Sequence, residues 1–166
     1  MAWTDLADVL DAAVRQRLRY TAAHKLTVDI DPKLPFVRVD PALLEQAIGQ
    51  LIENATKYSP AGSDVAMVAR TEDDEVVLSI IDKGAGLTEE EANNLFQRSY
   101  RGPRHVGNVP GLGLGLWIAR IFVAANGGTL SAYSPGSQQG TTMSIRLPIP
   151  PNLAPPAARL SDVKTD

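Results

Sequence analysis

The sequence has no cysteine and only two histidines, His24 and His105. Disulfides and thiolate metal sites are therefore excluded, and a multi-histidine zinc site is not expected. No apolar run approaches the roughly 20 residues that a membrane helix needs, and we expect no secretory signal at the start. The net charge of -3 lacks the basic excess typical of nucleic-acid binding. A cytoplasmic protein without a nucleic-acid partner is the default expectation.

With 166 residues, 44% of them hydrophobic, the chain has the length and apolar content of one soluble domain. From Pro148 onward prolines crowd and apolar periodicity ends. We therefore expect one domain over residues 1–148 and a proline-rich, disordered C-terminal tail over residues 149–166.

Apolar periodicity divides this domain into helices and strands. It predicts helices over residues 5–23, 40–58 and 114–125, and a further helix start at Thr88. Alternation predicts strands over residues 26–30, 36–39, 64–70, 76–81, 129–133 and 142–147. Together they predict an α+β fold, a two-layer α/β sandwich with helices on one face of a mixed sheet. The strand order does not follow from the pattern.

Polar side chains follow one edge of the predicted helix 40–58. Gln46, Gln50 and Asn54 recur every four residues, and Lys57 or Tyr58 continues the row. A solvated face would look the same. Asparagine is a poor former of helix interiors, however, because its amide competes for backbone groups. A functional role for Asn54 and a solvated face are therefore both open.

The segment Asp82-Lys83-Gly84-Ala85-Gly86 directly follows the predicted strand 76–81. Glycines allow a sharp turn and a close ligand approach, and the carboxylate can accept a hydrogen bond from an exocyclic amine such as that of adenine. A plain turn uses the same residues.

The third pattern is the run Gly111-Leu112-Gly113-Leu114-Gly115-Leu116, which opens the predicted helix 114–125. Alternate glycines free backbone N–H groups to bind a phosphate, and the helix N-terminus adds its positive dipole end. A hinge or a close helix crossing is the alternative, but phosphate binding better explains three glycines. The segment 96–110 before it carries three arginines. A mobile lid whose cations approach the phosphates fits this composition, and a solvated loop fits nearly as well for Arg104.

In order and spacing, these motifs resemble the ATP-binding catalytic domain of sensor histidine kinases, in the GHKL superfamily shared with DNA gyrase, Hsp90 and MutL. The resemblance covers roughly residues 5–148. It implies the Bergerat ATP-binding fold, in which three helices cover one face of a mixed five-stranded sheet. Within the family, the glycine-leucine run with Val109-Pro110 before it is similar to that of the potassium-responsive KdpD-type kinases.

The resemblance implies ATP and Mg²⁺ as cofactors and gives individual residues a role. Asn54 holds Mg²⁺, Lys57 approaches the phosphates and Tyr58 flanks the adenine. Asp82 binds the adenine amine, and Thr141 or Thr142 lies nearby. The other nucleotide-binding residues that it implies are Gly84, Gly86, Leu87, Phe96, Arg101, Gly111, Leu112, Gly113, Leu114, Gly115 and Leu116.

The chain departs from the family pattern at two positions. Gln50 stands where the family usually has a second asparagine, and it keeps an amide there for the metal. Ser99 stands where the segment Leu95-Phe96-Gln97-Arg98 is usually followed by an aromatic residue, and Tyr100 can substitute.

These residues favour phosphoryl transfer over hydrolysis. ATP-hydrolysing relatives place a glutamate at the position of Gln50, and a glutamine cannot activate water as a general base. The residues implied for catalysis are Asn54, Gln50, Glu53, Lys57 and Arg98. Glu53 is open to two interpretations: it polarises an acceptor histidine, or it is a helix-surface glutamate.

The family's acceptor is a histidine followed by an acidic residue, on a dimerisation domain before this one. His24 is followed by Lys25 and His105 by Val106, so neither fits. We therefore expect a monomeric catalytic domain that acts on a separate dimerisation domain, with a response regulator as the next partner. A membrane would be involved only through the rest of a full-length sensor.

Two alternatives share the nucleotide fold. One is an anti-sigma-factor-type serine kinase, which the long glycine-leucine run and the Phe96 segment disfavour. The other is a non-catalytic ATP-gated binding module, which Gln50 keeps open.

Overall fold

The structure is a computed structural model that describes residues 1–98, 100 and 114–151. Its main sheet has five strands in the order β2-β4-β5-β7-β6. β2 pairs with β4 in parallel, and the other neighbours are antiparallel. The strands of this sheet are β2 (Lys25–Ile30), β4 (Asp64–Glu72), β5 (Glu75–Asp82), β6 (Thr129–Tyr133) and β7 (Thr141–Pro148).

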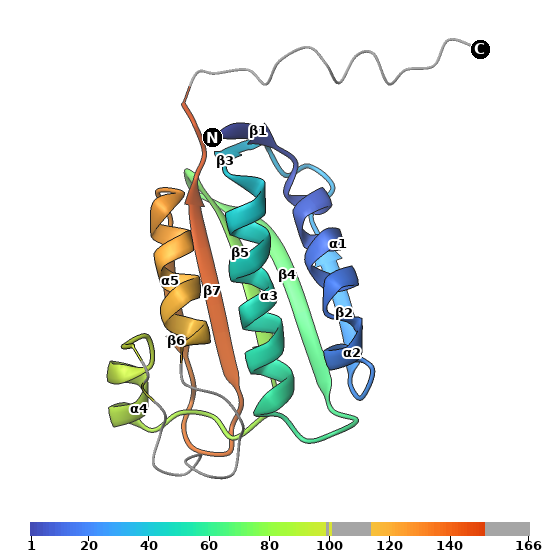
Figure 1. Cartoon of the computed structure of the whole chain (residues 1–166), viewed down its shortest axis with the longest axis vertical. Helices are drawn as coiled ribbons and strands as arrows, with labels where there is room; N and C mark the ends of the chain where they lie inside the picture. Colours follow the sequence, from blue (N-terminus) through green and yellow to red (C-terminus); the bar gives the residue numbers. More distant parts are fainter. Residues whose placement is uncertain (99, 101–113, 152–166) are drawn as a thin grey trace, which may run out of the picture.

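Three helices cover one face of this sheet (Figure 1). They are α1 (Leu6–Gln16), α3 (Pro41–Lys57) and α5 (Gly115–Ala125), and the two shorter helices are α2 (Leu18–Thr21) and α4 (Glu89–Asn94). The predicted fold, a two-layer sandwich with a mixed five-stranded sheet under three helices, is confirmed. Among the described residues, no helix is both long and apolar enough to cross a membrane.

Two features at the N-terminal end differ from the sequence prediction. The predicted helix 5–23 is wrong in its continuity, because the backbone leaves the helical region at Arg17 and divides it into α1 and α2. A strand that the sequence did not reveal, β1 (Ala2–Thr4), pairs with β3 (Val37–Val39) in a separate two-stranded sheet. β1 has only three residues, too few to show a period, and its pairing with β3 is long-range.

The core lies between α3 and the central strands. α3 begins as predicted, because Asp40 accepts hydrogen bonds from the N–H groups of Ala42 (3.0 Å) and Leu43 (3.2 Å), with Pro41 in the first turn. Its fully buried apolar residues are Leu44, Ala47, Ile48, Leu51, Ile52 and Ala55. Each large side chain buried there stabilises the fold by about 1.5–3 kcal/mol. This packing holds the polar edge of α3 in a fixed position.

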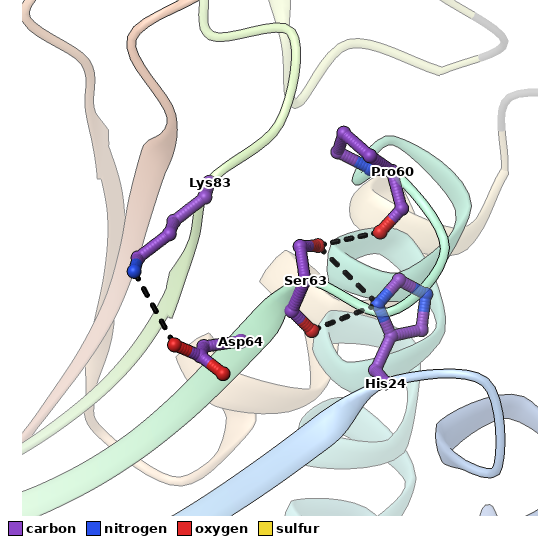
Figure 2. Close-up of polar contacts among 5 residues, drawn as sticks. All are labelled: His24, Pro60, Ser63, Asp64 and Lys83. Carbon is purple, nitrogen blue, oxygen red and sulfur yellow. Dashed lines mark hydrogen bonds and ion pairs between the residues drawn. The ribbon is translucent and has the colours of Figure 1, made fainter.

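His24 contacts both the end of α3 and the loop that follows it. The ring nitrogens of His24 lie 3.3 Å from the carbonyl oxygen of Ser63 and 3.1 Å from that of Thr56. Figure 2 shows the Ser63 side of this contact, where the Ser63 hydroxyl also donates to the carbonyl oxygen of Pro60 (2.6 Å). His24 therefore ties the turn before β2 to the loop between α3 and β4.

Candidate functional site

The end of α3, the turn after Asp82 and the start of β7 lie next to one another around the end of β5. The N–H of Ala85 donates to the carbonyl oxygen of Tyr58 (3.1 Å), which joins the turn after β5 to the end of α3. The N–H of Gly140 donates to the carbonyl oxygen of Gly84 (3.1 Å), which joins the same turn to the start of β7. Three segments far apart in the sequence thus form one backbone framework.

Asp82 is the last residue of β5 and only 5% exposed. Its Oδ1 accepts hydrogen bonds from the N–H groups of Gly84 (2.9 Å) and Thr141 (3.2 Å). Burial raises the pKa of Asp82 above its ordinary value, and these two backbone hydrogen bonds oppose that shift. Within the described residues both bonds go to Oδ1 and none to Oδ2. The carboxylate is thus fixed by one oxygen, and the other can accept a hydrogen bond from a ligand.

Two glycines let the backbone pass close to Asp82 and Tyr58. A Cβ at Gly84 would overlap the carbonyl oxygen of Tyr58. A Cβ at Gly140 would overlap the carbonyl oxygen of Asp82, and Gly140 also has a φ of +78°, where side chains are disfavoured. A side chain at position 84 would not fit, so the predicted turn requires a glycine there.

Ser134 is a site residue that the sequence analysis missed. Its hydroxyl accepts from the N–H of Leu87 (3.0 Å) and lies 2.7 Å from the carbonyl oxygen of Gly140, to which it can donate. It therefore ties the segment after Gly86 to the turn between β6 and β7. No local pattern distinguishes this serine from an ordinary turn residue, because Leu87, which it joins to this turn, is distant in the sequence.

Of the two candidate threonines, Thr141 is the one beside Asp82. Thr141 is buried and pairs directly with Asp82 across β5 and β7. Thr142, the next residue along β7, points to the opposite face of the sheet, where it pairs with Ile81 and Tyr133.

The amide of Gln50 reaches the start of α5. A Cβ added at Gly115, the first residue of α5, would lie 2.5 Å from Gln50 Oε1. Asn54 lies one turn further along α3 and is half-buried, and Lys57 is exposed. Gln50, on the polar edge of α3, thus faces the described end of the glycine-leucine run.

The residues before and after the undescribed segment also meet. Phe96 and Leu116 pack against the hydrophobic core. The guanidinium carbon of Arg98 lies 5.3 Å from the centre of the Trp117 ring, in the first turn of α5. Leu114 is the N-cap and supplies no side-chain hydrogen bond. The candidates Arg101, Gly111, Leu112 and Gly113 lie outside the described residues.

Glu53 is held by an arginine that the sequence analysis did not select. Its Oε1 lies 3.0 Å from Arg17 Nε, close enough for an ion pair but not aligned for a hydrogen bond. The side chains of Arg17 and Glu53 are 11% and 16% exposed, so Glu53 is not a solvated surface glutamate. The Arg17 guanidinium lies over Gly49, where a Cβ would overlap it. The prediction of one continuous helix over residues 5–23 gives no indication that Arg17 turns inward.

The packing of Arg17 on Gly49 predicts that Gly49→Ala has opposite effects on stability in the presence and absence of the arginine. In wild type, Gly49→Ala is expected to destabilise the fold by about 1–3 kcal/mol, because the new methyl group displaces the Arg17 guanidinium. In an Arg17→Ala background, which removes every Arg17 atom near Gly49, the same change is expected to stabilise by up to about 1 kcal/mol, because alanine is the better helix former. Urea unfolding of the four proteins measures both values. The same sign in both backgrounds would contradict the close packing of Arg17 on Gly49.

The donor set at this site fits a magnesium ion bound with a polyphosphate. Among residues 1–98, 100 and 114–151, no group of three histidine, aspartate or glutamate side chains could hold a metal alone. Mg²⁺ prefers oxygen ligands and commonly takes only one or two from the protein, the rest coming from phosphates and water. The side-chain oxygens of Gln50 and Asn54 on one edge of α3 suit that requirement.

Comparison with known proteins agrees with these motifs. Residues 39–151 match the family model described as histidine kinase-, DNA gyrase B-, and HSP90-like ATPase. The chain is 35% identical over 131 residues to the sensor protein KdpD of Clostridium acetobutylicum. It is 36% identical over 149 residues to the histidine-protein kinase/phosphatase MprB of Mycolicibacterium paratuberculosis. These matches cover 78% and 87% of this chain but 15% and 28% of the relatives, so the chain spans less than a third of either protein.

Solved structures of histidine kinases are also similar to this chain. The mycobacterial sensor histidine kinase MprB matches with a TM-score of 0.76 at 30% identity, covering 87% of this chain and 95% of that chain. The catalytic domain of histidine kinase ThkA matches with a TM-score of 0.74, covering 89% and 98%. At 18% identity, the second match shows a shared fold.

Proposed function

Because the chain belongs to the family of histidine kinase-, DNA gyrase B- and HSP90-like ATPases, we propose that it binds Mg·ATP and transfers the γ-phosphoryl group to a histidine on a separate dimerisation domain. The observation that carries the nucleotide assignment is Asp82. Its buried carboxylate is fixed through Oδ1 by two backbone N–H groups, which leaves Oδ2 to accept from the adenine amine.

The neighbouring residues supply the rest of the proposed site. Thr141 lies beside Asp82, and Tyr58 is joined through its backbone to the same turn, so both suit the adenine end. Gln50 and Asn54 would hold Mg²⁺, which supplies charge neutralisation for the phosphates when bound. Lys57 and Arg98 are exposed cations that can approach the phosphates.

We propose transfer to a protein rather than to water because Gln50 stands where a general base would be needed. Gln50, at the edge facing α5, has no proton-accepting carboxylate. The nearest carboxylate on α3, Glu53, is engaged by Arg17 and faces that arginine. We propose that Glu53 supports the acceptor step from this held position and does not activate water.

The acceptor and the next partner are proposed from the relatives, which are sensor kinases. The acceptor would be the histidine-bearing dimerisation domain of the same kinase, and the phosphoryl group would pass on to a response regulator. The cytoplasm would be the site of this reaction. Neither His24, which is packed against two carbonyl groups, nor His105, which precedes Val106, suits an acceptor in this chain.

Incubation with labelled ATP tests this proposal. The chain alone is expected to bind Mg·ATP without becoming phosphorylated. With the dimerisation domain added, acid-labile phosphohistidine is expected on that domain and none on a variant lacking its histidine. Acid-stable phosphoserine on a protein target would favour the serine-kinase alternative. Tight ATP binding with no transfer would favour the ATP-gated binding module.

A further inference from the structure

Arg98 and Trp117 form a contact between two segments that the proposed site needs together. The guanidinium carbon of Arg98 lies 5.3 Å from the centre of the Trp117 ring. Arg98 lies four residues after the end of α4, and Trp117 is the third residue of α5. Arg98 is exposed and Trp117 half-buried, so the ring is a fixed surface and the cation remains open to a ligand.

The Arg98 cation lies beside the N-terminal end of α5. The first turn of a helix carries the positive end of its dipole, which disfavours a nearby cation. α5 has no acidic residue in its first turn, and its N-cap Leu114 offers no side-chain acceptor to the free N–H groups. The face of the Trp117 ring attracts the guanidinium and so offsets this repulsion. A bound polyphosphate would be attracted by both the cation and the helix end.

We propose that Trp117 is a positioning residue that holds the Arg98 guanidinium for the terminal phosphate. The pair would thereby favour a nucleoside triphosphate over the diphosphate. This inference rests on the proposed function, because it assumes that the phosphates lie at the start of α5. It adds to that function a residue that no motif of the sequence analysis selects and a contribution to ligand specificity.

Calorimetric titration with Mg·ATP and Mg·ADP separates this role from a structural one. Arg98→Met is expected to weaken ATP binding about tenfold or more with little effect on ADP, because a charge-assisted contact is lost. Trp117→Leu is expected to weaken ATP binding about two- to fivefold, again without a matching effect on ADP. Trp117→Phe keeps an aromatic face and should retain most of the ATP preference. In the Arg98→Met background, Trp117→Leu should change nothing further.

The chain contains a matched control. Arg38 lies over the ring of Trp3 at 5.7 Å, in the two-stranded sheet of β1 and β3. Trp3→Leu is expected to leave the ratio of ATP to ADP affinity unchanged. Because the chain has only two tryptophans, Trp3→Phe leaves Trp117 as the single tryptophan, which can be excited selectively over the tyrosines. Its emission should change with Mg·ATP, and adding Arg98→Met should reduce that change.

Two results would overturn the inference while leaving the proposed function intact. One is an equal loss of ATP and ADP affinity in Trp117→Leu. The other is the same loss from Trp117→Leu whether or not Arg98 is present. Absence of ATP binding by the wild type would overturn the proposed function and this inference together.

Discussion

Asp82→Asn is expected to make the free chain more stable while weakening its binding of Mg·ATP by about 10- to 100-fold. Asn keeps an oxygen for the N–H groups of Gly84 and Thr141 but puts an NH₂ group where Oδ2 accepts from adenine. Loss of a charge-assisted hydrogen bond of about 1.5–3 kcal/mol gives the expected loss of affinity. The gain in stability follows from removing a carboxylate that is only 5% exposed.

The stability gain should depend on pH in a defined direction. Burial raises the pKa of Asp82 in the folded chain above its ordinary value of 3.8. The fold therefore disfavours the ionised form, and the resulting destabilisation is complete at a pH above the raised pKa. It fades as the pH falls through that value and is gone below 3.8. The difference in stability between Asp82→Asn and the wild type should accordingly be largest near neutral pH and shrink in acid.

Thermal unfolding with and without Mg·ATP measures both effects. Asp64→Asn is a suitable control, because Asp64 is exposed at the start of β4 and pairs only with Lys83 (3.3 Å) among the described residues. Figure 2 shows that this pair is separate from the His24 contact. The control should keep the ligand-induced rise in melting temperature. An unchanged rise in Asp82→Asn would refute the adenine assignment.

Gly140→Ala is expected to destabilise the fold by about 2–5 kcal/mol and to abolish detectable ATP binding. A side chain at its φ of +78° costs about 1–2 kcal/mol. The added methyl group would also overlap the carbonyl oxygen of Asp82, which is backbone and cannot turn away. That overlap adds about 1–3 kcal/mol and shifts the Asp82 carboxylate.

Gly62→Ala separates the conformational cost of a positive φ from the cost of steric overlap. Gly62 has a similar φ of +82°, but nothing lies within 4 Å of the position of its Cβ. It should therefore show only the conformational cost, with ATP binding preserved. Urea unfolding and calorimetry of both variants make the comparison. Equal destabilisation by the two substitutions would show that the close approach of Gly140 to Asp82 is absent in solution.

The sequence predicts those parts of the fold that depend on local chemistry. Asp40 and Pro41 define the start of α3, and the buried stripe of that helix is set by its 3.6-residue period. The capping box of α4, in which Thr88 and Glu91 exchange hydrogen bonds, was visible as a helix start for the same reason. Once the family resemblance is added, the five-stranded sheet and its three helices follow.

What the sequence could not show depends on contacts between distant residues. The side chain of Arg17 can turn inward because Gly49, which lies on α3, has no side chain in its way. Ser134 has its role because its hydroxyl meets Leu87 and Gly140 across a turn. Trp117 gives no local sign that its ring meets Arg98. The ligand roles of Asn54, Lys57 and the undescribed glycines stay predictions.

The central claim is that the amine of adenine binds to Asp82, and one calorimetric comparison tests it directly. ATP and inosine triphosphate carry the same phosphates, but the inosine base has a carbonyl oxygen where adenine has the amine. The wild type is expected to bind Mg·ATP about tenfold or more tightly than the inosine nucleotide. Asp82→Asn is expected to lose or reverse this preference, because its NH₂ group can donate to the carbonyl oxygen. Equal affinity of the wild type for both nucleotides, unchanged by the substitution, would contradict the account.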